Sequence, residues 1–135
     1  MKICAEKFIN LLKERELHFS TRVDEEDGAV IVDFPYDGKI AKIILNGELG
    51  EYASFYLQYE SVSAEKRLAT IEACNDQNCR FKWVTFYVDK DNDLMLHVDA
   101  LLSAEDAADE AFEMLVRMIN IGKEAKNDLM KAIYA

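Results

Sequence analysis

The chain has 135 residues, about the length of one folded domain, so we expect a single domain over residues 1–135. Half of the residues are hydrophobic, and there are only five Gly and one Pro, a composition that excludes disordered and fibrous proteins. The formal net charge of −10 repels phosphate backbones and anionic lipid surfaces, which argues against nucleic-acid and membrane partners.

The first segment and the cysteines indicate the cellular compartment. Charged side chains such as Glu6 and Lys7 interrupt the first apolar segment, so it does not form the core of a signal peptide, and no stretch is long enough to span a bilayer. The three cysteines, Cys4, Cys74 and Cys79, lack the spacing of a disulfide framework and are typical of free thiols in a reducing compartment. We therefore expect a cytoplasmic protein.

The first half of the chain predicts one helix followed by four strands. Apolar residues recur at helical spacing through residues 2–16, which indicates an amphipathic helix. Four β-rich runs follow, separated by turn sequences that include Pro35 and the pair Asn46-Gly47. The predicted strands span residues 17–23, 29–34, 40–45 and 52–59. Their order and short connections predict an antiparallel meander.

The second half predicts a helix, a hairpin and a long final helix. Ser63 is suited to cap a helix that ends near residues 75–78, and two strands are predicted over 80–88 and 94–101. Ser103 and Asp106 have the spacing of a capping box for a helix that runs to about Tyr134. Its expected buried stripe consists of Ala108, Phe112, Leu115, Ile119, Ala125, Leu129 and Ile133. Gly122 is the one position where this helix could bend or break.

The predicted fold class is α+β, an antiparallel sheet with helices packed on it, in the order α-β-β-β-β-α-β-β-α. No glycine-rich phosphate loop of the Walker or Rossmann type occurs, so we expect no nucleotide cofactor.

The sequence does not predict a metal site. Asp89, Asp91 and Asp93 have the spacing of the first three ligands of a calcium loop, but Leu94 and Ala100 stand where that loop requires Gly and a bidentate Glu. We favour a charged β-turn there. Zinc is disfavoured as well, because the pair of cysteines at 74 and 79 is accompanied by only two histidines elsewhere in the chain.

One pair of residues has the geometry of a general base. His97 and Asp99 lie two apart on a predicted strand and share a face, which would let the carboxylate orient the imidazole. No nucleophile motif accompanies them. We therefore expect a structural histidine and no catalytic residues. The alternative is a small-ligand-binding or enzymatic domain that uses His97, Asp99 and a nearby thiol.

The strands carry more apolar surface than a one-sided sheet needs. Residues 80–88, 94–101 and 52–59 place apolar or aromatic side chains on both faces, whereas a sheet with one face in water alternates more cleanly. Both faces should then be covered, either by the chain's own helices or by a second copy or another protein. The candidate protein-binding surface consists of Tyr52, Tyr56, Phe81, Trp83, Tyr87 and Met95.

Parts of the sequence resemble the YbjN family. The resemblance is carried by residues 62–68 and 72–78, the aromatic run 80–88 and the hairpin into 94–101. In that family a helix ends in an Asn-x-x-Asn step, which Asn75 and Asn78 match, and Asn tolerates the left-handed conformation that ends a helix. Cys74 and Gln77 depart from the pattern, because the family tends to place apolar residues there.

The resemblance implies a fold and a role. YbjN-like proteins are similar in fold to type III secretion chaperones, which are small acidic α+β homodimers that hold an extended segment of a partner on apolar surface. The family is linked to regulation of sensory transduction in bacteria. We therefore expect a non-enzymatic, homodimeric, regulatory or chaperone-like module whose protein partner the sequence does not identify.

Overall fold

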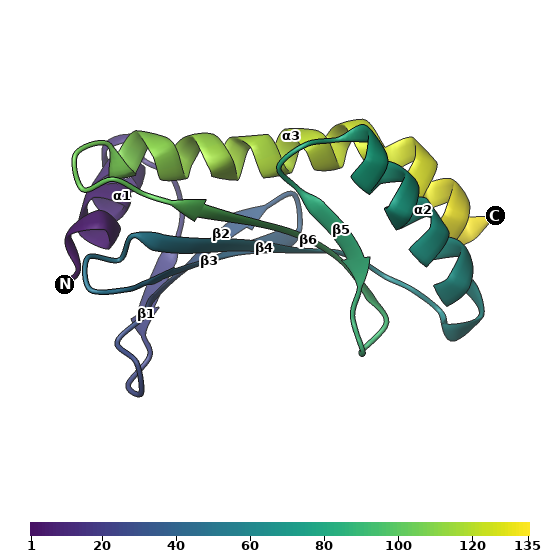
Figure 1. The fold of residues 1–135 in the computed structure, drawn as a ribbon, viewed down its shortest axis with the longest axis horizontal. Helices are drawn as coiled ribbons and strands as arrows, with labels where there is room; N and C mark the ends of the chain where they lie inside the picture. The colour runs from purple at the N-terminus through teal and green to yellow at the C-terminus, as the bar shows by residue number, and fades with distance from the viewer.

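Six strands form one antiparallel sheet in the computed structural model, which describes residues 1–135 (Figure 1). The strands are β1 (Ser20–Val23), β2 (Val30–Tyr36), β3 (Lys39–Asn46), β4 (Tyr52–Ser61), β5 (Thr85–Val88) and β6 (Asp93–Leu101). Their order in the sheet is β1-β2-β3-β4-β6-β5. The first four strands form the predicted meander, and the β5–β6 hairpin joins it through β6. The predicted α+β class is confirmed.

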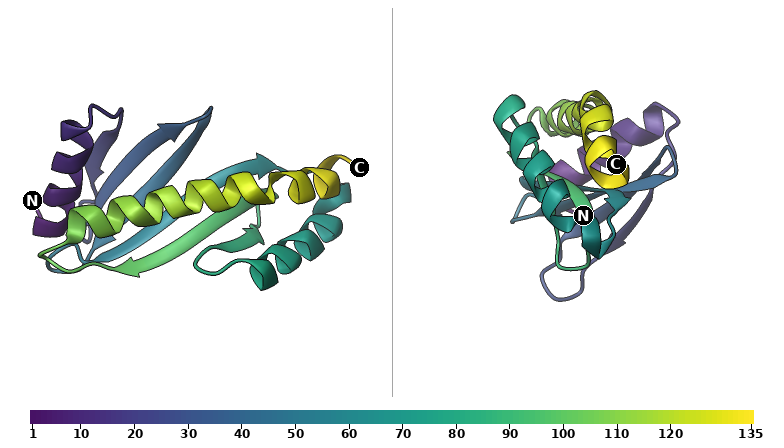
Figure 2. Two further views of the ribbon diagram at one scale, coloured as in Figure 1. Left: turned by 90° about the horizontal axis from the view of Figure 1, so that it is seen from above. Right: turned by 90° about the vertical axis from the view of Figure 1, so that its right-hand side faces the viewer.

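Three α-helices lie on one side of this sheet (Figure 1). They are α1 (Ile3–Glu14), α2 (Arg67–Arg80), which follows a short 3-10 turn η1 (Ala64–Lys66), and α3 (Ala107–Tyr134). Seen from above, α3 runs along the length of the sheet, with α1 near one end and α2 near the other (Figure 2). Both shorter helices contact α3. No helix of the structure has the combination of length and hydropathy that a membrane span requires.

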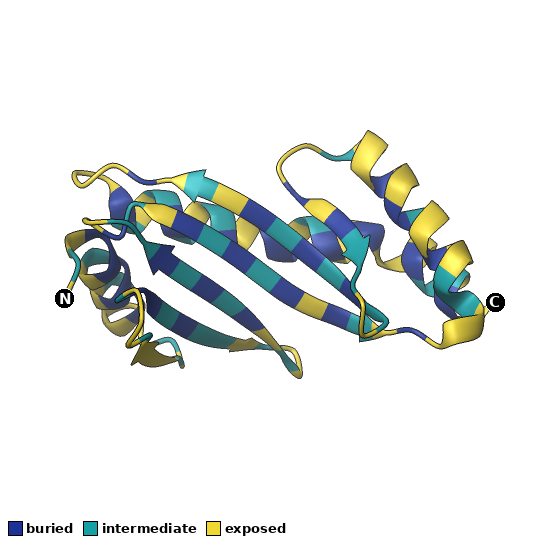
Figure 3. Cartoon of the chain, turned by 60° about the horizontal axis from the view of Figure 1, so that its bottom comes forward, coloured by how far each residue is buried: buried dark blue, intermediate teal, exposed yellow.

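The core lies between the helices and one face of the sheet. Every second residue of β4 and β6 points into it, and Phe55, Leu94 and Leu96 are completely buried there. The residues between them point the other way and are partly or fully exposed, which Figure 3 shows as alternating colours along the strands. A two-residue period of burial is characteristic of strands with one face in the core.

Gly122 does not break α3. The helix is continuous through this residue, which packs against the sheet. A Cβ atom at Gly122 would lie 3.1 Å from Leu96 Cδ2 and 3.2 Å from Tyr59 Cε2. The hydroxyl of Tyr59 donates a hydrogen bond of 2.8 Å to the carbonyl oxygen of Gly122. The glycine therefore serves close approach of α3 to the sheet.

The predicted strand over 80–88 is wrong in its first half. Helix α2 extends to Arg80, residues 81–84 form a loop, and only the last four residues pair with β6. Trp83 has a φ of 78°, and the N–H of Val84 donates to the carbonyl of Lys82 across it at 2.9 Å, which makes a tight three-residue turn. Aromatic residues favour strands in general, but Phe81 instead packs on Phe86 from this loop.

The predicted end of α2 near residues 75–78 is also wrong. Asn75 and Asn78 lie inside the helix, and neither has a positive φ. Asn78 instead binds the free edge of β5. Its side-chain amide donates to the carbonyl of Phe86 at 3.0 Å, and its side-chain oxygen accepts from the N–H of Phe86 at 2.7 Å. One amide thus takes the place of a neighbouring strand.

The start of α3 differs from the prediction by a few residues. Ser103 Oγ accepts from the N–H of Asp106 at 3.1 Å, as in a capping box, but the carboxylate that returns to the N–H of Ser103, at 2.8 Å, belongs to Glu110. The buried stripe begins with Ala107 and Ala111, while the predicted residues Ala108 and Phe112 are half-buried. The remainder of the predicted stripe is buried.

Candidate functional site

The face of the sheet turned away from the helices is not covered by any part of the chain; we call it the open face (Figure 3). The β1–β2 turn and the β5–β6 turn project from the sheet on this side in Figure 1, so the face is bounded near both ends. Its apolar and aromatic side chains include Ile31, Ile40, Ile44, Tyr52, Tyr56, Tyr87, Met95 and Leu101.

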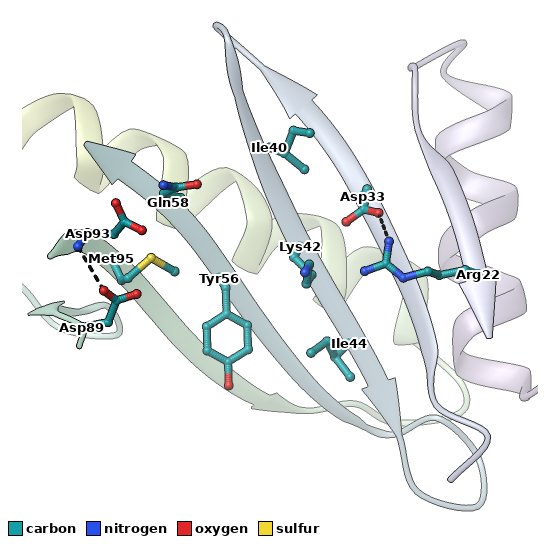
Figure 4. Close-up of a pocket in the computed structure, with 10 residues that line it drawn as sticks. All are labelled: Arg22, Asp33, Ile40, Lys42, Ile44, Tyr56, Gln58, Asp89, Asp93 and Met95. Carbon is teal, nitrogen blue, oxygen red and sulfur yellow. Dashed lines mark hydrogen bonds and ion pairs between the residues drawn. The ribbon is translucent and has the colours of Figure 1, made fainter. Parts of the chain in front are cut away.

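The middle of the open face is hollowed, with a volume of about 620 Å³; we call this the central hollow (Figure 4). Its walls come from β1, β2, β3, β4, β6 and the β5–β6 turn. The lining residues are Arg22, Asp33, Ile40, Lys42, Ile44, Tyr56, Gln58, Asp89, Asp93 and Met95. The hollow is therefore built by segments far apart in the sequence.

An aromatic and sulfur-containing cluster lies at the centre of the open face. Tyr56 and His97 are cross-strand neighbours whose rings stack with centroids 4.5 Å apart and planes 2° apart. Met95 is opposite Gln58 on one side and Tyr87 on the other. Burial raises the pKa of Tyr87, and the nearby Tyr56 hydroxyl raises it further. Such a surface suits contact with hydrophobic side chains.

His97 and Asp99 meet as predicted, but their surroundings do not form a catalytic relay. His97 Nε2 lies 2.8 Å from Asp99 Oδ1. Burial acts to raise the pKa of Asp99, yet the cross-strand neighbour Ser54 and the imidazole of His97 outweigh it, and the pKa lies below its ordinary value. The carboxylate thus stands between the hydroxyl and the imidazole, whereas a nucleophile relay needs the imidazole in the middle.

The thiols do not share this face. Cys4 belongs to α1, whereas Cys74 and Cys79 belong to α2, and all three are free. Burial raises the pKa of Cys74 to about 11 and also raises that of Cys4, so both are protonated near neutral pH. A protonated, buried thiol is a poor nucleophile.

The charges of the central hollow are arranged unevenly. Arg22 and Asp33 form an ion pair at 2.7 Å. Lys42 stands between Ile40 and Ile44 on β3 and makes no hydrogen bond or ion pair within the chain (Figure 4). The hollow therefore offers one free cation near its middle.

The opposite end of the hollow is acidic. The carboxylate of Asp89 accepts from the backbone N–H of Asp91 at 2.9 Å and of Asp93 at 3.0 Å, so it closes the β5–β6 turn. This is the charged turn expected in place of a calcium loop. Nowhere in the structure do three or more His, Cys, Asp or Glu side chains come together as metal ligands.

The structure separates the six residues predicted for protein binding into two groups. Tyr52, Tyr56, Tyr87 and Met95 lie on the open face. Phe81 and Trp83 do not, because they belong to the loop before β5. Trp83 is 59% exposed, and the Arg117 guanidinium of α3 lies 5.4 Å from its ring centre.

The prediction missed the contribution of β1 and β3 to the open face. Lys42 and Arg22 line the central hollow together with Ile40 and Ile44. The sequence of β3 contained part of this signal, because Ile40 and Ile44 lie on the face opposite Ala41, Ile43 and Leu45. Nothing local to Arg22 indicated that it would reach the same hollow, since that depends on the pairing of β1 with β2.

The chain belongs to the YbjN family, whose model matches residues 6–124 and describes its members as putative bacterial sensory transduction regulators. The fold is similar to that of YbjN from E. coli, a putative transcription regulator, with a TM-score of 0.63, 16% identity and 91% of each chain covered. It is also similar to the Yersinia pestis type III secretion chaperone SycH, solved in complex with a stable fragment of YscM2. Here the TM-score is 0.51, the identity 12%, and the match covers 87% of this chain and 98% of SycH. No functionally curated protein matches the chain in sequence. The family resemblance and the chaperone-like fold expected from the sequence are confirmed.

Proposed function

We propose that this chain is a non-enzymatic protein-binding module of regulatory or chaperone-like type, which holds an extended segment of a partner protein on its open face. The observation that carries the proposal is the uncovered cluster of Tyr56, Tyr87 and Met95 beside the central hollow. Tyr and Met are enriched where proteins touch, and an uncovered apolar patch is typical of an interaction site. The family description and the SycH complex with a protein fragment support the same reading.

The charges of the central hollow favour a partner segment that carries an acidic residue at one position and a basic residue at another. Lys42 forms no ion pair within the chain, because its cross-strand neighbour Asp33 pairs with Arg22 instead, whereas Asp89 and Asp93 make the far end acidic. An acidic partner residue would pair with Lys42, and a basic one would lie near the β5–β6 turn. Apolar residues between them would contact Tyr56 and Met95.

Affinity capture with matched variants tests this proposal. We expect Tyr56→Ser/Met95→Glu to lose a partner that the native protein retains, because it removes an aromatic contact and places a charge in the apolar centre. Leu68→Glu is the control, since Leu68 is 77% exposed on α2, away from the open face. Thermal melts establish that the variants fold. Retention of the same proteins by the open-face variant would refute the proposal.

The alternative function, a small-ligand-binding or enzymatic domain, rests on His97 and Asp99. It predicts that His97→Gln and Asp99→Asn each abolish the cellular function while leaving protein capture intact. Our proposal predicts that Tyr56→Ser/Met95→Glu reduces the cellular function more than His97→Gln or Asp99→Asn does. Comparing the three variants in one cellular assay separates the two functions.

We also propose that the protein is a cytoplasmic homodimer. Tyr52 and Leu101 are cross-strand partners at one end of the open face, and they are 60% and 71% exposed. This pair is apolar surface beyond the central hollow and supports a contact with a second copy. Sedimentation at tens of micromolar should show a dimer that Leu101→Ser weakens. A native protein that sediments as a monomer would contradict this proposal and leave the partner-binding one standing.

A further inference from the structure

A second, smaller cleft lies on the helix side of the sheet, between α3, the β2–β3 turn and the end of β4; we call it the lysine cleft. It has a volume of about 190 Å³, and Lys39, Lys123 and Lys126 are among its lining residues. Gly122 and Tyr59 also line it, and the hydrogen bond between them holds α3 close to the sheet. Lys39 approaches the cleft from the sheet, whereas Lys123 and Lys126 approach it from α3 with their side chains exposed.

These three lysines have no anionic partner in the chain. None of them forms an ion pair, although the chain has 26 acidic and 16 basic residues. On α3, the positions three and four residues from Lys123 and Lys126 hold no carboxylate. The two lysines are three residues apart and therefore repel each other on one helix face. Elsewhere on α3, Arg117 does pair with Glu113, at 2.9 Å.

Two of the ammonium groups are held against aromatic rings. Lys39 Nζ lies 5.7 Å from the ring centre of Tyr59, and Lys123 Nζ lies 5.3 Å from that of Tyr36. Cation–π contacts of this length restrict a lysine without neutralising its charge. The charges of Lys39 and Lys123 therefore lie near the cleft and remain available to a ligand.

The two carboxylates of the cleft do not neutralise it. Asp37 and Glu60 also line the space, but neither comes within ion-pair distance of a lysine. The charge of Glu60 raises the pKa of the nearby Tyr134 hydroxyl. Three cations against two anions leave a local excess of positive charge on a protein whose net charge is −10. This local excess of positive charge favours an anionic ligand.

We propose that the lysine cleft binds a single anionic group, a phosphate or a carboxylate. The volume is below the roughly 300–1,000 Å³ typical of sites for drug-sized ligands, yet it can hold a group the size of a few water molecules. Lysine binds phosphate as a point charge with rotatable donors, which suits a compact tetrahedral or planar anion. This site is separate from the open face and does not depend on the function proposed for it.

An NMR titration of the full chain with inorganic phosphate tests the site, at constant pH and with sodium chloride exchanged to keep the ionic strength fixed. We expect saturable shifts of the side-chain signals of Lys39, Lys123 and Lys126 and of the Gly122 amide. Lys123→Gln/Lys126→Gln should weaken binding roughly tenfold or more, because two charged donors are lost. Lys13→Gln/Lys90→Gln changes the net charge equally and should leave binding unchanged.

Two further titrations identify the source of the anion. Succinate tests a carboxylate, and a short phosphoserine peptide tests a phosphorylated side chain. The proposal is supported if any of the three anions gives saturable shifts that Lys123→Gln/Lys126→Gln abolishes. The three affinities then rank the sources of the anion. Shifts that stay linear with concentration for all three, or that both double variants weaken equally, would overturn it, since they indicate only diffuse charge.

Discussion

Tyr59 connects the sheet to the middle of α3 through one buried hydroxyl. Its hydrogen bond to Gly122 is 2.8 Å long, and burial, with a smaller effect of Glu60, raises its pKa to about 12 from the usual 10. The folded state therefore keeps the phenol proton at pH values where the unfolded chain releases it. The stability that this provides is complete below about pH 10 and is lost as the pH rises to about 12.

We predict that Tyr59→Phe lowers the free energy of unfolding by about 1 kcal/mol at neutral pH, the usual net value of a lost hydrogen bond. The difference between the native protein and the variant should shrink as the pH rises from 10 to 12, because only the native protein carries this phenol. Urea denaturation at several pH values measures both quantities. A difference that stays constant to pH 12 would contradict the account of this residue.

Gly122 is a second residue at which the packing of α3 on the sheet can be tested. A Cβ atom there would approach Leu96 and Tyr59 within 3.1–3.2 Å. We predict that Gly122→Ala destabilises the protein by about 1–3 kcal/mol through overpacking, even though Ala favours helix by about 1 kcal/mol. Asn120→Ala, at an exposed position of α3, is the control and should be neutral or stabilising in the same denaturation assay.

The sequence predicted that Gly122 could bend or break the helix. Its role in the close approach of α3 to the sheet could not be predicted from the residues next to it in the chain. The atoms that forbid a side chain there belong to β4 and β6, far away in the chain. Helix propensity describes a residue and its turn, whereas close approach depends on tertiary packing. A gain in stability for Gly122→Ala equal to that of Asn120→Ala would show that this packing is loose.

At the scale of elements, α2 protects the edge of β5. The two hydrogen bonds from Asn78 to Phe86 satisfy backbone groups that would otherwise face solvent or another strand. The edge of the sheet is thereby closed to further pairing. The same contact explains how a four-residue strand stays fixed at the end of the sheet.

We predict that Asn78→Ala costs about 1–3 kcal/mol of stability, because two backbone groups lose their partner. It should also increase self-association through the freed edge, which size-exclusion chromatography at rising concentration would detect. Asn75→Ala is the matched control, since Asn75 is exposed on the same helix and binds nothing comparable. Equal effects of the two substitutions would contradict the role assigned to Asn78.

Most elements were predictable from local signals. β-rich runs bounded by turn residues marked β2, β3, β4 and β6, and apolar residues at helical spacing marked α3. The segment 80–88 was misjudged because its aromatic residues satisfy strand propensity while packing from a loop. The pair Asn75 and Asn78 was noticed, but its function depends on β5, a partner that no local rule identifies.

At the scale of the whole molecule, the helices lie on one side and leave the open face uncovered (Figure 1). The sequence predicted too much apolar strand surface for a one-sided sheet, and four of the six residues chosen on that basis lie on this face. It could not show which face the helices would take, nor that Lys42 and Arg22 would share one hollow, since both depend on strand order.

Site-specific photo-crosslinking shows whether the open face holds a segment of a partner protein. A photoreactive phenylalanine analogue at position 56 reports on the open face, and the same analogue at position 68 reports on the exposed surface of α2. We predict discrete cross-links in living cells from position 56 to one segment of a partner protein, and none to that segment from position 68. Cross-links to the same segment from position 68 alone, or none from position 56, would contradict it.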